Sequence, residues 1–363
     1  MAALFLALTL VLSAVPGQAQ PISKKDLGRK ALETVVSHLK SDDSDVRARA
    51  AEILGATGNK AALGMLRAML NDKDKYVRIA AAKALWELGS PAGMKTVYAI
   101  LNDIPAQGPV AVTNTPLTEL KIISQNKIRE NALVALAAMK GDKAADELYK
   151  LKNDNYGPIR DAAARELARL GHEEDLAQFT DALASEDEAI RYESAALMSK
   201  ICAGTAAAPM KALLTTEKSV RVRIAVLEAL KCNPEKKDAM PELITLADDE
   251  NLTIKYKAVA VLSGIKDPKV QAKLAEVAAG TQDLRLRITA QEGLILNGAA
   301  PDAALAQSAM DSVSPETKLE ALEVISAFLE SDAMPLLAQA LDDDNVQVKL
   351  SAALQVLKRF SKK

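Results

Sequence analysis

Asp74 and the run Val77-Arg78-Ile79-Ala80-Ala81-Ala82-Lys83-Ala84-Leu85 show a pattern that returns along the whole chain. Each copy has a capping position, a basic residue four positions later and, in eight of ten copies, alanine three positions after that. The basic residues are Arg47, Arg78, Arg129, Arg160, Arg191, Arg223, Lys255, Arg287, Lys318 and Lys349. Successive copies are 31 or 32 residues apart, except that 51 residues separate Arg78 from Arg129. A period this regular predicts stacked repeats.

The capping position, four before each basic residue, is expected to start a helix. Eight of the ten copies have Asp, Asn or Ser there, and the other two have Gln125 and Tyr156. Side-chain oxygens of Asp, Asn and Ser accept hydrogen bonds from the free amides at a helix N-terminus. In the second repeat an earlier segment places Ala62, Met65 and Leu66 on one apolar helical face. We therefore predict an all-α chain: an α-solenoid, or superhelix, of about ten stacked antiparallel two-helix repeats over residues 20–363.

Residues 1–19 are expected to be a signal peptide, because an apolar run is followed by Pro16 and by the small residues Gly17 and Ala19. The run is shorter than the roughly 20 residues that span a bilayer, and no later stretch qualifies. The mature chain is thus expected to be exported, to the periplasm or the cell exterior, without a membrane span. Its formal net charge of -2 gives no basic surplus for nucleic acid, so a protein or peptide partner is expected.

The repeats resemble HEAT repeats, and the resemblance covers essentially the whole mature chain. It is carried by a proline, paired leucines, an Asp-containing turn and a basic residue before an Ala-rich helix, as in Pro335-Leu-Leu-Ala-Gln-Ala-Leu-Asp-Asp-Asp-Asn-Val-Gln-Val-Lys-Leu-Ser-Ala-Ala. The short period is similar to that of the bacterial phycobilisome-lyase-like type. The resemblance implies a scaffold or adaptor for protein-protein interaction with no catalysis of its own. The alternative is a subunit of a lyase-like enzyme, or a HEAT protein that binds a cofactor or pigment.

Residues for catalysis or for metal binding are scarce. His38 and His172 are the two histidines of the chain. The pair His172-Glu173 resembles the His-Glu pairs that hold two irons in HEAT-type deoxyhypusine hydroxylase, but several pairs are needed there. Gly171 precedes it, so we expect a junction between two helices. No catalytic, cofactor or metal site is predicted.

The recurrent basic residues have two interpretations. Ten stacked cations could line a groove for an anionic ligand. We instead expect each to bond an Asp or Asn in the turn of its own or the neighbouring repeat, because a recurrent residue beside a recurrent turn is what stacking requires.

Cys202 and Cys232 lie near the ends of successive second helices. Two buried free thiols are favoured over a disulfide there. Neighbouring helix axes are about 8 to 10 Å apart, whereas a disulfide needs Cα atoms within about 7 Å.

Departures from the repeat are the better indications of function. About 20 extra residues fall within residues 103–123, between the two helices of the third repeat. Trp86 stands eight after Arg78, where other repeats have small residues such as Gly55. We expect Trp86 to pack under the insertion, against Ile104, Pro105 or Val110; the alternative is a partner-binding anchor. Tyr192 and Tyr256, each one position after its basic residue and two repeats apart, could add contact anchors, although half-buried packing is favoured for each. The candidate partner-binding residues are Trp86, Ile104, Val110, Tyr192 and Tyr256.

Overall fold

The structure is a computed structural model that describes residues 23–105 and 116–360. Within these residues all regular structure is helical and forms ten pairs of α-helices. The first helices of the pairs are α1 (Lys24–His38), α3 (Leu63–Met69), α5 (Met94–Leu101), α7 (Ala145–Leu151), α9 (Glu173–Ala182), α11 (Ala207–Thr216), α13 (Met240–Leu246), α15 (Pro268–Gly280), α17 (Ala303–Met310) and α19 (Glu330–Leu341).

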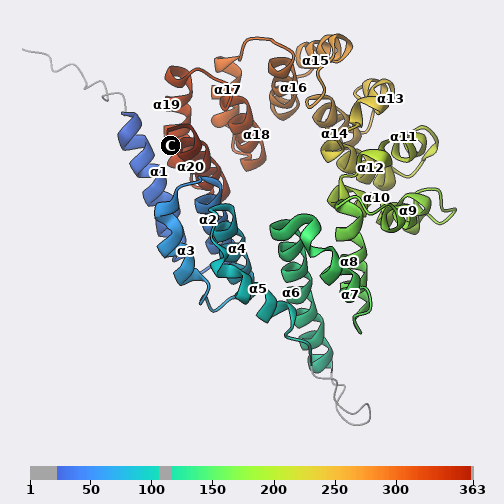
Figure 1. Ribbon diagram of the computed structural model, residues 1–363. Coiled ribbons are helices and arrows are strands. Elements are labelled where there is room, and N and C mark those ends of the chain that lie inside the picture. Colours follow the sequence, from blue (N-terminus) through green and yellow to red (C-terminus); the bar gives the residue numbers. More distant parts are fainter. Residues whose placement is uncertain (1–22, 106–115, 361–363) are drawn as a thin grey trace, which may run out of the picture.

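The second helices carry the recurrent basic residues. They are α2 (Ser44–Ala56), α4 (Lys75–Glu87), α6 (Pro116–Lys140), α8 (Gly157–Arg169), α10 (Glu188–Ile201), α12 (Val220–Cys232), α14 (Leu252–Leu262), α16 (Leu284–Leu296), α18 (Pro315–Ile325) and α20 (Val346–Phe360). Figure 1 shows the second helices on the inner side of a ring and most first helices on its outside. The predicted all-α solenoid of ten two-helix repeats is confirmed.

Helix starts follow the predicted caps in nine repeats. Asp43, Asp74 and Asn251 each precede a second helix and accept hydrogen bonds from amides of its first turn. At the other end of α4, Gly89 takes the left-handed conformation, with φ of 80°, as expected for a residue that ends a helix. Capping chemistry therefore sets the boundaries of most second helices.

The third repeat differs from the prediction. Gln125 does not start a helix, because α6 begins at Pro116 and continues to Lys140. The side-chain amide of Gln125 instead donates to the backbone carbonyl of Asp103 at 2.9 Å. The insertion, expected as an addition between two helices of ordinary length, thus lengthens α6 at its N-terminal end.

Two expectations concern other parts of the chain. The predicted signal peptide, residues 1–19, lies outside the described residues. Among the described helices, none combines the length and the apolar character that crossing a membrane requires.

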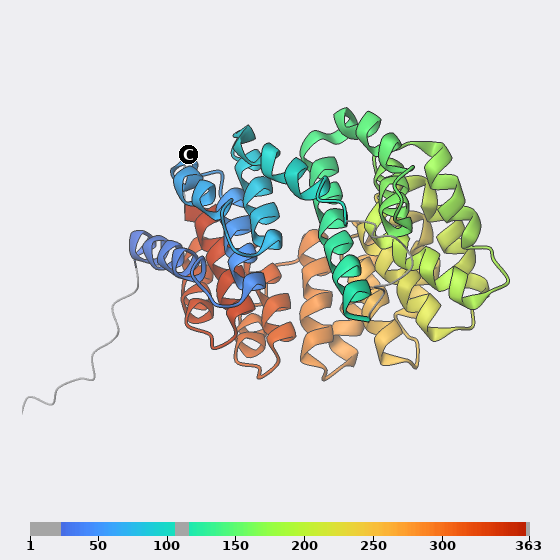
Figure 2. The same ribbon diagram turned by 90° about the horizontal axis from the view of Figure 1, so that it is seen from below.

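The two ends of the solenoid meet. Helix α1 packs against α20 and also contacts α19, and α2 contacts α20 as well, so the stack closes on itself (Figures 1 and 2). Leu27 and Val35 of α1 belong to the same buried apolar cluster as Leu337 and Val356. At the edge of this contact Lys30 pairs with Asp342 at 2.6 Å. Terminal repeats of a solenoid need protection from water, and here each covers the other.

Small residues let neighbouring second helices approach closely. Ala50, Ala81, Ala132 and Ala163 occupy the predicted alanine position and are fully buried. At Gly55 an added Cβ would lie 2.6 Å from the Cα of Ala84 in α4, and real Cβ atoms essentially never come that close to other atoms. Small residues at these positions thus permit the close approach of neighbouring second helices.

Candidate functional site

The recurrent basic residues join neighbouring repeats. We call each joint a rung: the basic residue of one second helix and the turn residue six positions before the next basic residue. Arg47 donates to both carboxylate oxygens of Asp72 at 2.9 Å. Four further rungs have the same arrangement, namely Arg129 with Asp154, Arg191 with Glu217, Arg223 with Asp249 and Lys318 with Asp343. The structural interpretation of the cations is confirmed at these five positions.

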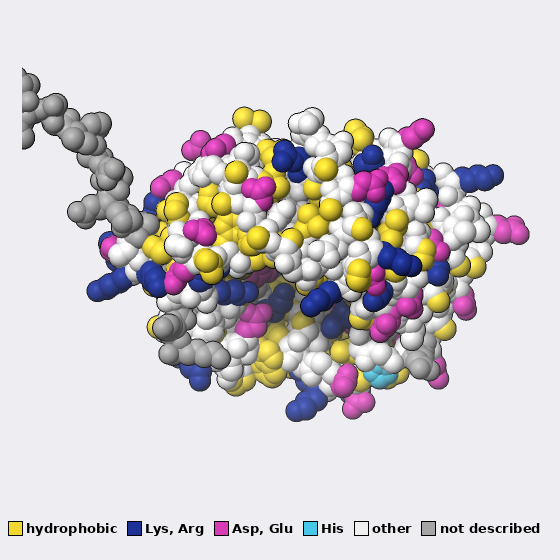
Figure 3. Space-filling model, turned by 90° about the horizontal axis from the view of Figure 1, so that it is seen from above, with side chains coloured by type: hydrophobic (Ala, Val, Ile, Leu, Met, Phe, Trp, Pro, Cys, Tyr) yellow, Lys and Arg dark blue, Asp and Glu magenta, His cyan; other side chains and the backbone are white. Residues whose placement is uncertain are grey.

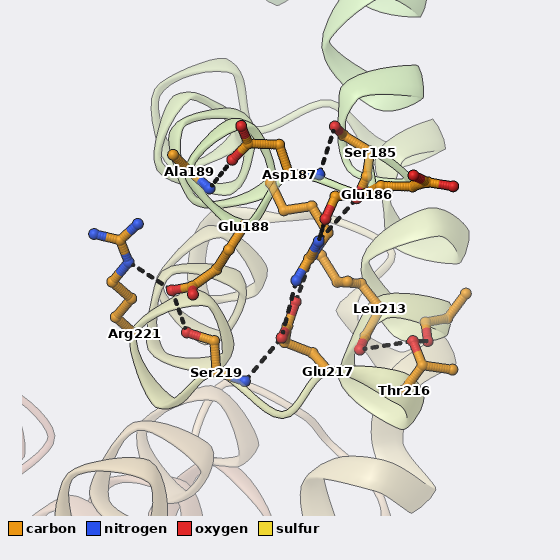
Figure 4. Close-up of polar contacts among 12 residues, drawn as sticks. Ser185, Glu186, Asp187, Glu188, Ala189, Leu213, Thr216, Glu217, Ser219 and Arg221 are labelled. Atoms are coloured by element: carbon orange, nitrogen blue, oxygen red, sulfur yellow. Dashed lines mark hydrogen bonds and ion pairs between the residues drawn. The ribbon is translucent and has the colours of Figure 1, made fainter.

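Each carboxylate of such a rung has a second task. Glu217 accepts a hydrogen bond from the backbone amide of Ser219 at 2.8 Å, next to the start of α12 (Figure 4). On the other side, Arg191 donates to the carbonyls of Ser185 and Glu186 in its own turn. One ion pair therefore fixes two turns at once, and these residues are part of the scaffold.

The insertion changes one rung. Asp103 follows Arg78 by 25 positions, the spacing that separates Arg47 from Asp72, but it pairs with Lys75 and accepts a hydrogen bond from Gln125. The hydrogen bond from Lys75 lowers the pKa of Asp103. The buried Nε of Arg78 has no hydrogen-bond partner among the described residues. The extended α6 thus replaces the regular joint with one of its own.

Cys202 and Cys232 form a disulfide, so the expectation of two free thiols is wrong. Their Cα atoms are 5.4 Å apart. The expectation used the spacing of helix axes, but Cys202 follows the last residue of α10 in the left-handed conformation, with φ of 55°. The chain leaves the helix there, and the two residues can approach more closely than the helices themselves.

Trp86 lies at the opposite end of α4 from Lys75, the residue that contacts Asp103 at the start of the insertion. It is eleven residues from Lys75, which pairs with Asp103, and this corresponds to roughly 16 Å along a helix. The predicted packing of Trp86 against Ile104 or Pro105 is therefore wrong. Ile104 is 56% exposed, and Val110 lies outside the described residues. Asp103 contacts the first turn of α4, whereas Trp86 is in its last turn.

Trp86 instead lines a hollow of about 500 Å³ between the second and third repeats. The ring is 37% exposed. The hollow is completed by Met94 and Tyr98 of α5, Met139 and Lys140 of α6, and Lys143 of η3 (Gly141–Ala144). Methionine side chains adapt to different apolar shapes, and tryptophan is prominent among residues that anchor protein partners. We therefore take this hollow, the Trp86 hollow, as the candidate site.

Polar contacts hold one wall of the Trp86 hollow. Tyr98 donates to Glu147 at 2.8 Å, and the ammonium group of Lys140 donates to the same carboxylate at 2.6 Å. The hydrogen bond to Glu147 raises the pKa of Lys140. Because Lys140 already has a counter-ion, Lys143 is the cation at this hollow for which the structure gives no carboxylate partner among the described residues. The site thus combines apolar walls with a cation at its edge.

Tyr192 and Tyr256 lie in other repeats and do not join Trp86. Each carries an arginine from the following second helix on its ring: Arg221 at 4.7 Å from Tyr192 and Arg285 at 4.3 Å from Tyr256. The hydroxyl of Tyr256 also contacts Glu320, two repeats further on. Burial, then the hydrogen bond to Glu320, raises the pKa of Tyr256 to about 12. Tyr256 is thus held in the structure, whereas Tyr192 keeps an exposed face.

Sequence reasoning found Trp86 but missed the rest of the hollow. Met94 and Tyr98 are four residues apart and so share a face of α5, which is a helical signal in the sequence. Met139 and Lys140 come from the end of α6, and the alignment of repeats gives no reason to single them out. His172 lies at the predicted junction, between Gly171 and the start of α9, with its ring 3.0 Å from the hydroxyl of Tyr149.

This architecture defines the chain as an α-solenoid of two-helix repeats. The HEAT repeat family matches residues 32–108, 148–231 and 207–295, which together cover more than half of the chain. The chain therefore belongs to the HEAT repeat family, as the resemblance predicts. None of the curated proteins matches the chain significantly.

Several solved structures are similar to the chain. The complex of CpcE and CpcF of phycocyanin lyase from Nostoc has 23% identity and a TM-score of 0.37, over 66% of this chain and 97% of that one. Kap121p has 16% identity and a TM-score of 0.34, over 92% and 42% of the respective chains. A homology model of the AP-3 complex has 12% identity and a TM-score of 0.35, over 89% of this chain and 58% of that one.

Proposed function

We propose that this chain is an exported, non-catalytic scaffold or adaptor that binds a protein partner at the Trp86 hollow. The observation that carries the proposal is the partly exposed side chain of Trp86 beside Met94 and Met139. An apolar hollow of this kind suits an apolar side chain of a partner, which would displace water from it. The nearby Lys143 favours a partner with an acidic residue next to that side chain.

The remainder of the molecule supports a binding role. We call a rung closed when its basic residue is ion-paired with the turn carboxylate. The closed rungs and the contact of α1 with α20 hold the repeats in a fixed arrangement, which limits the entropy lost when a partner binds. On the face shown in Figure 3, basic and acidic side chains are interspersed. Together with the net charge of -2, this favours a protein partner over nucleic acid.

Export is proposed from two features. The apolar N-terminal run has the composition of a signal peptide. The disulfide between Cys202 and Cys232 is suited to an oxidising compartment, such as the periplasm or the cell exterior. Fractionation of cells, with mass spectrometry of the mature N-terminus, tests this part of the proposal; a chain that keeps its first residues and stays in the reducing cytosol would refute it.

Affinity capture from the exported fraction tests the binding site. The wild-type chain is compared with Trp86→Ala and with Tyr76→Ala, a matched control because Tyr76 lies on the same helix and is 36% exposed. We expect wild type and Tyr76→Ala to retain the same partner and Trp86→Ala to lose it, while thermal unfolding shows all three to be folded. Equal capture by all three variants would refute the site. Visible absorbance of the purified chain would instead favour the alternative of a pigment-binding protein.

A further inference from the structure

The turn residues of the rungs fall into two chemical groups. One group has a carboxylate, as in Asp249 and Glu217, and the other has a hydroxyl, as in Thr281 and Ser312. Both groups cap the following helix in the same way. The amide of Ser219 donates to Glu217 at 2.8 Å, and the amide of Asp283 donates to Thr281 at 3.1 Å. A hydroxyl therefore keeps the capping contact but gives no negative charge to the basic residue of the preceding repeat.

The basic residue opposite Thr281 is consequently unpaired. The ammonium group of Lys255 makes no hydrogen bond or ion pair with any residue that the structure describes. A lysine in this position can form a closed rung, because Lys318 binds Asp343 at 2.5 Å. The two rungs differ in the turn residue, which is Asp343 opposite Lys318 and Thr281 opposite Lys255. We call the rung at Lys255 open, because its basic residue has no carboxylate partner among the described residues.

A hollow of about 350 Å³ lies at this open rung, between α14 and α16. Lys257 and Arg285 also line it, but each already has a counter-ion: Glu228 lies 2.8 Å from Lys257, and Glu320 lies 3.4 Å from Arg285. The carboxylate of Asp283 also faces the hollow and accepts from the amide of Leu286 at 2.8 Å. Lys255 is thus the cation of this hollow that can take a further anion.

Apolar side chains also lie beside the open rung. Leu252 is 75% exposed and lines the same hollow, as does Tyr256. A small inorganic anion would make no use of these side chains, whereas an acidic residue within a peptide could contact them with its neighbours. The closed rungs also show which anion this fold accepts, since each of them holds an Asp or Glu carboxylate beside the cation.

We propose that the open rung at Lys255 binds the carboxylate of an acidic side chain from a partner protein. The carboxylate takes the position that Asp249 or Glu217 has in a closed rung, and Leu252 contacts the residue beside it. Helices α14 and α16 lie across the ring from α4 (Figure 1), so this site is separate from the Trp86 hollow and its test does not depend on that site.

The proposal is tested by measuring how tightly two peptides bind the full chain. They are acetyl-Leu-Glu-Leu-amide and its uncharged counterpart acetyl-Leu-Gln-Leu-amide, and binding is measured from changes in the amide chemical shifts of the chain in NMR spectra. We expect the wild-type chain to bind the Glu peptide about tenfold more tightly than the Gln peptide. Thr281→Asp closes the rung with an internal carboxylate, so it should lose this preference while its melting temperature stays unchanged or rises. Lys255→Gln should lose the preference as well.

The control is Lys318→Gln, which breaks a closed rung elsewhere and should keep the preference. Equal affinity of the wild-type chain for the two peptides would overturn the proposal. The proposal would also be overturned if both Thr281→Asp and Lys255→Gln kept the full preference for the Glu peptide over the Gln peptide. Inorganic phosphate that binds at Lys255 more tightly than the Glu peptide would overturn the assignment to a protein carboxylate.

Discussion

The Arg191–Glu217 pair shows how one side chain can join two repeats. Arg191 donates to Glu217 at 2.7 Å, and the Glu217 side chain is only 4% exposed. The hydrogen bond from Arg191 lowers the pKa of Glu217, and the same bond raises the pKa of Arg191. The carboxylate therefore stays ionised in the folded chain at pH values where it begins to take up a proton in the unfolded chain.

Replacement of Glu217 tests this coupling through the pH dependence of stability. Because the folded pKa lies below the unfolded pKa, the ion pair stabilises the fold above the unfolded pKa, near 4.3, and this contribution is lost as the pH falls through the folded pKa. Glu217→Gln should lower the free energy of unfolding by about 1 to 3 kcal/mol at neutral pH. The variant should also lose less stability than wild type on acidification. Chemical unfolding between pH 3 and 7 measures both. Equal pH profiles for wild type and variant would contradict the coupling.

The disulfide gives a second prediction at this scale. Cys202 and Cys232 are 30 residues apart in sequence, and closing a loop of this size stabilises a chain by about 2 to 4 kcal/mol. The double variant Cys202→Ser with Cys232→Ser should unfold at a lower temperature, and wild type in reductant should behave like it. Thiol titration of the unfolded, oxidised chain provides the check; two reactive thiols would mean that the bond does not form.

Sequence reasoning at the residue scale succeeded where a contact recurs. The basic residue and its turn carboxylate return in many repeats, so their pairing could be predicted from spacing alone. The disulfide could not, because it depends on how the chain leaves α10 at Cys202, and the left-handed turn there is not a repeated feature.

The contact of α2 with α4 is the clearest example at the scale of the helix. Gly55 lies so close to Ala84 that an added methyl group must displace backbone. Gly64 in α3 has free space around its Cα instead. The two glycines therefore offer a comparison in which the same substitution meets opposite surroundings.

We expect Gly55→Ala to destabilise the fold by about 1 to 3 kcal/mol through overpacking. Gly64→Ala should be neutral or stabilise by up to about 1 kcal/mol, because alanine favours the helix. Thermal and chemical unfolding of both variants provide the measurement. Destabilisation of the same size in both would show that steric contact at Gly55 is not the cause.

Helix boundaries were predictable where a capping residue marks them. The third repeat shows the limit of this reasoning. Between Pro116 and Gln125 there is no glycine or further proline, and Leu117 and Leu120 follow helical spacing, so nothing stops the helix before Gln125. Alignment on the repeat placed the helix start at Gln125, but local helix propensity extends α6 to Pro116.

At the scale of the whole molecule, the closed ring was not predictable. Periodicity specifies how one repeat packs on the next. Whether the ends meet depends on small rotations that add up over ten repeats, and the sequence pattern does not contain them. Leu27, Ala31 and Val35 of α1 are buried in the structure, and the apolar character of this helix is the only sequence signal for the contact.

Closure of the ring can be tested in solution by small-angle X-ray scattering. Leu27→Asp places a charge in the contact of α1 with its neighbours and should detach the helix, so that the radius of gyration increases. Leu32→Asp is the matched control, because Leu32 lies on the same helix and is 38% exposed; it should leave the scattering unchanged. Identical scattering from Leu27→Asp and wild type would contradict a ring held by α1.

Function in this molecule is assigned to features that interrupt the repeat. Five of the ten repeated cations join neighbouring repeats through ion pairs, whereas the Trp86 hollow occurs once and has apolar side chains with a cation at its edge. Trp86 is the single tryptophan of the chain, so its fluorescence reports on this hollow alone.

The most direct measurement is therefore the emission of Trp86 during titration with the partner obtained by affinity capture, using a partner segment that lacks tryptophan. If the partner fills the hollow, the ring loses contact with water, and the emission maximum should shift to shorter wavelength with a saturable dependence on concentration. Saturable binding with no change in the emission of Trp86 would place the partner elsewhere and contradict the assignment.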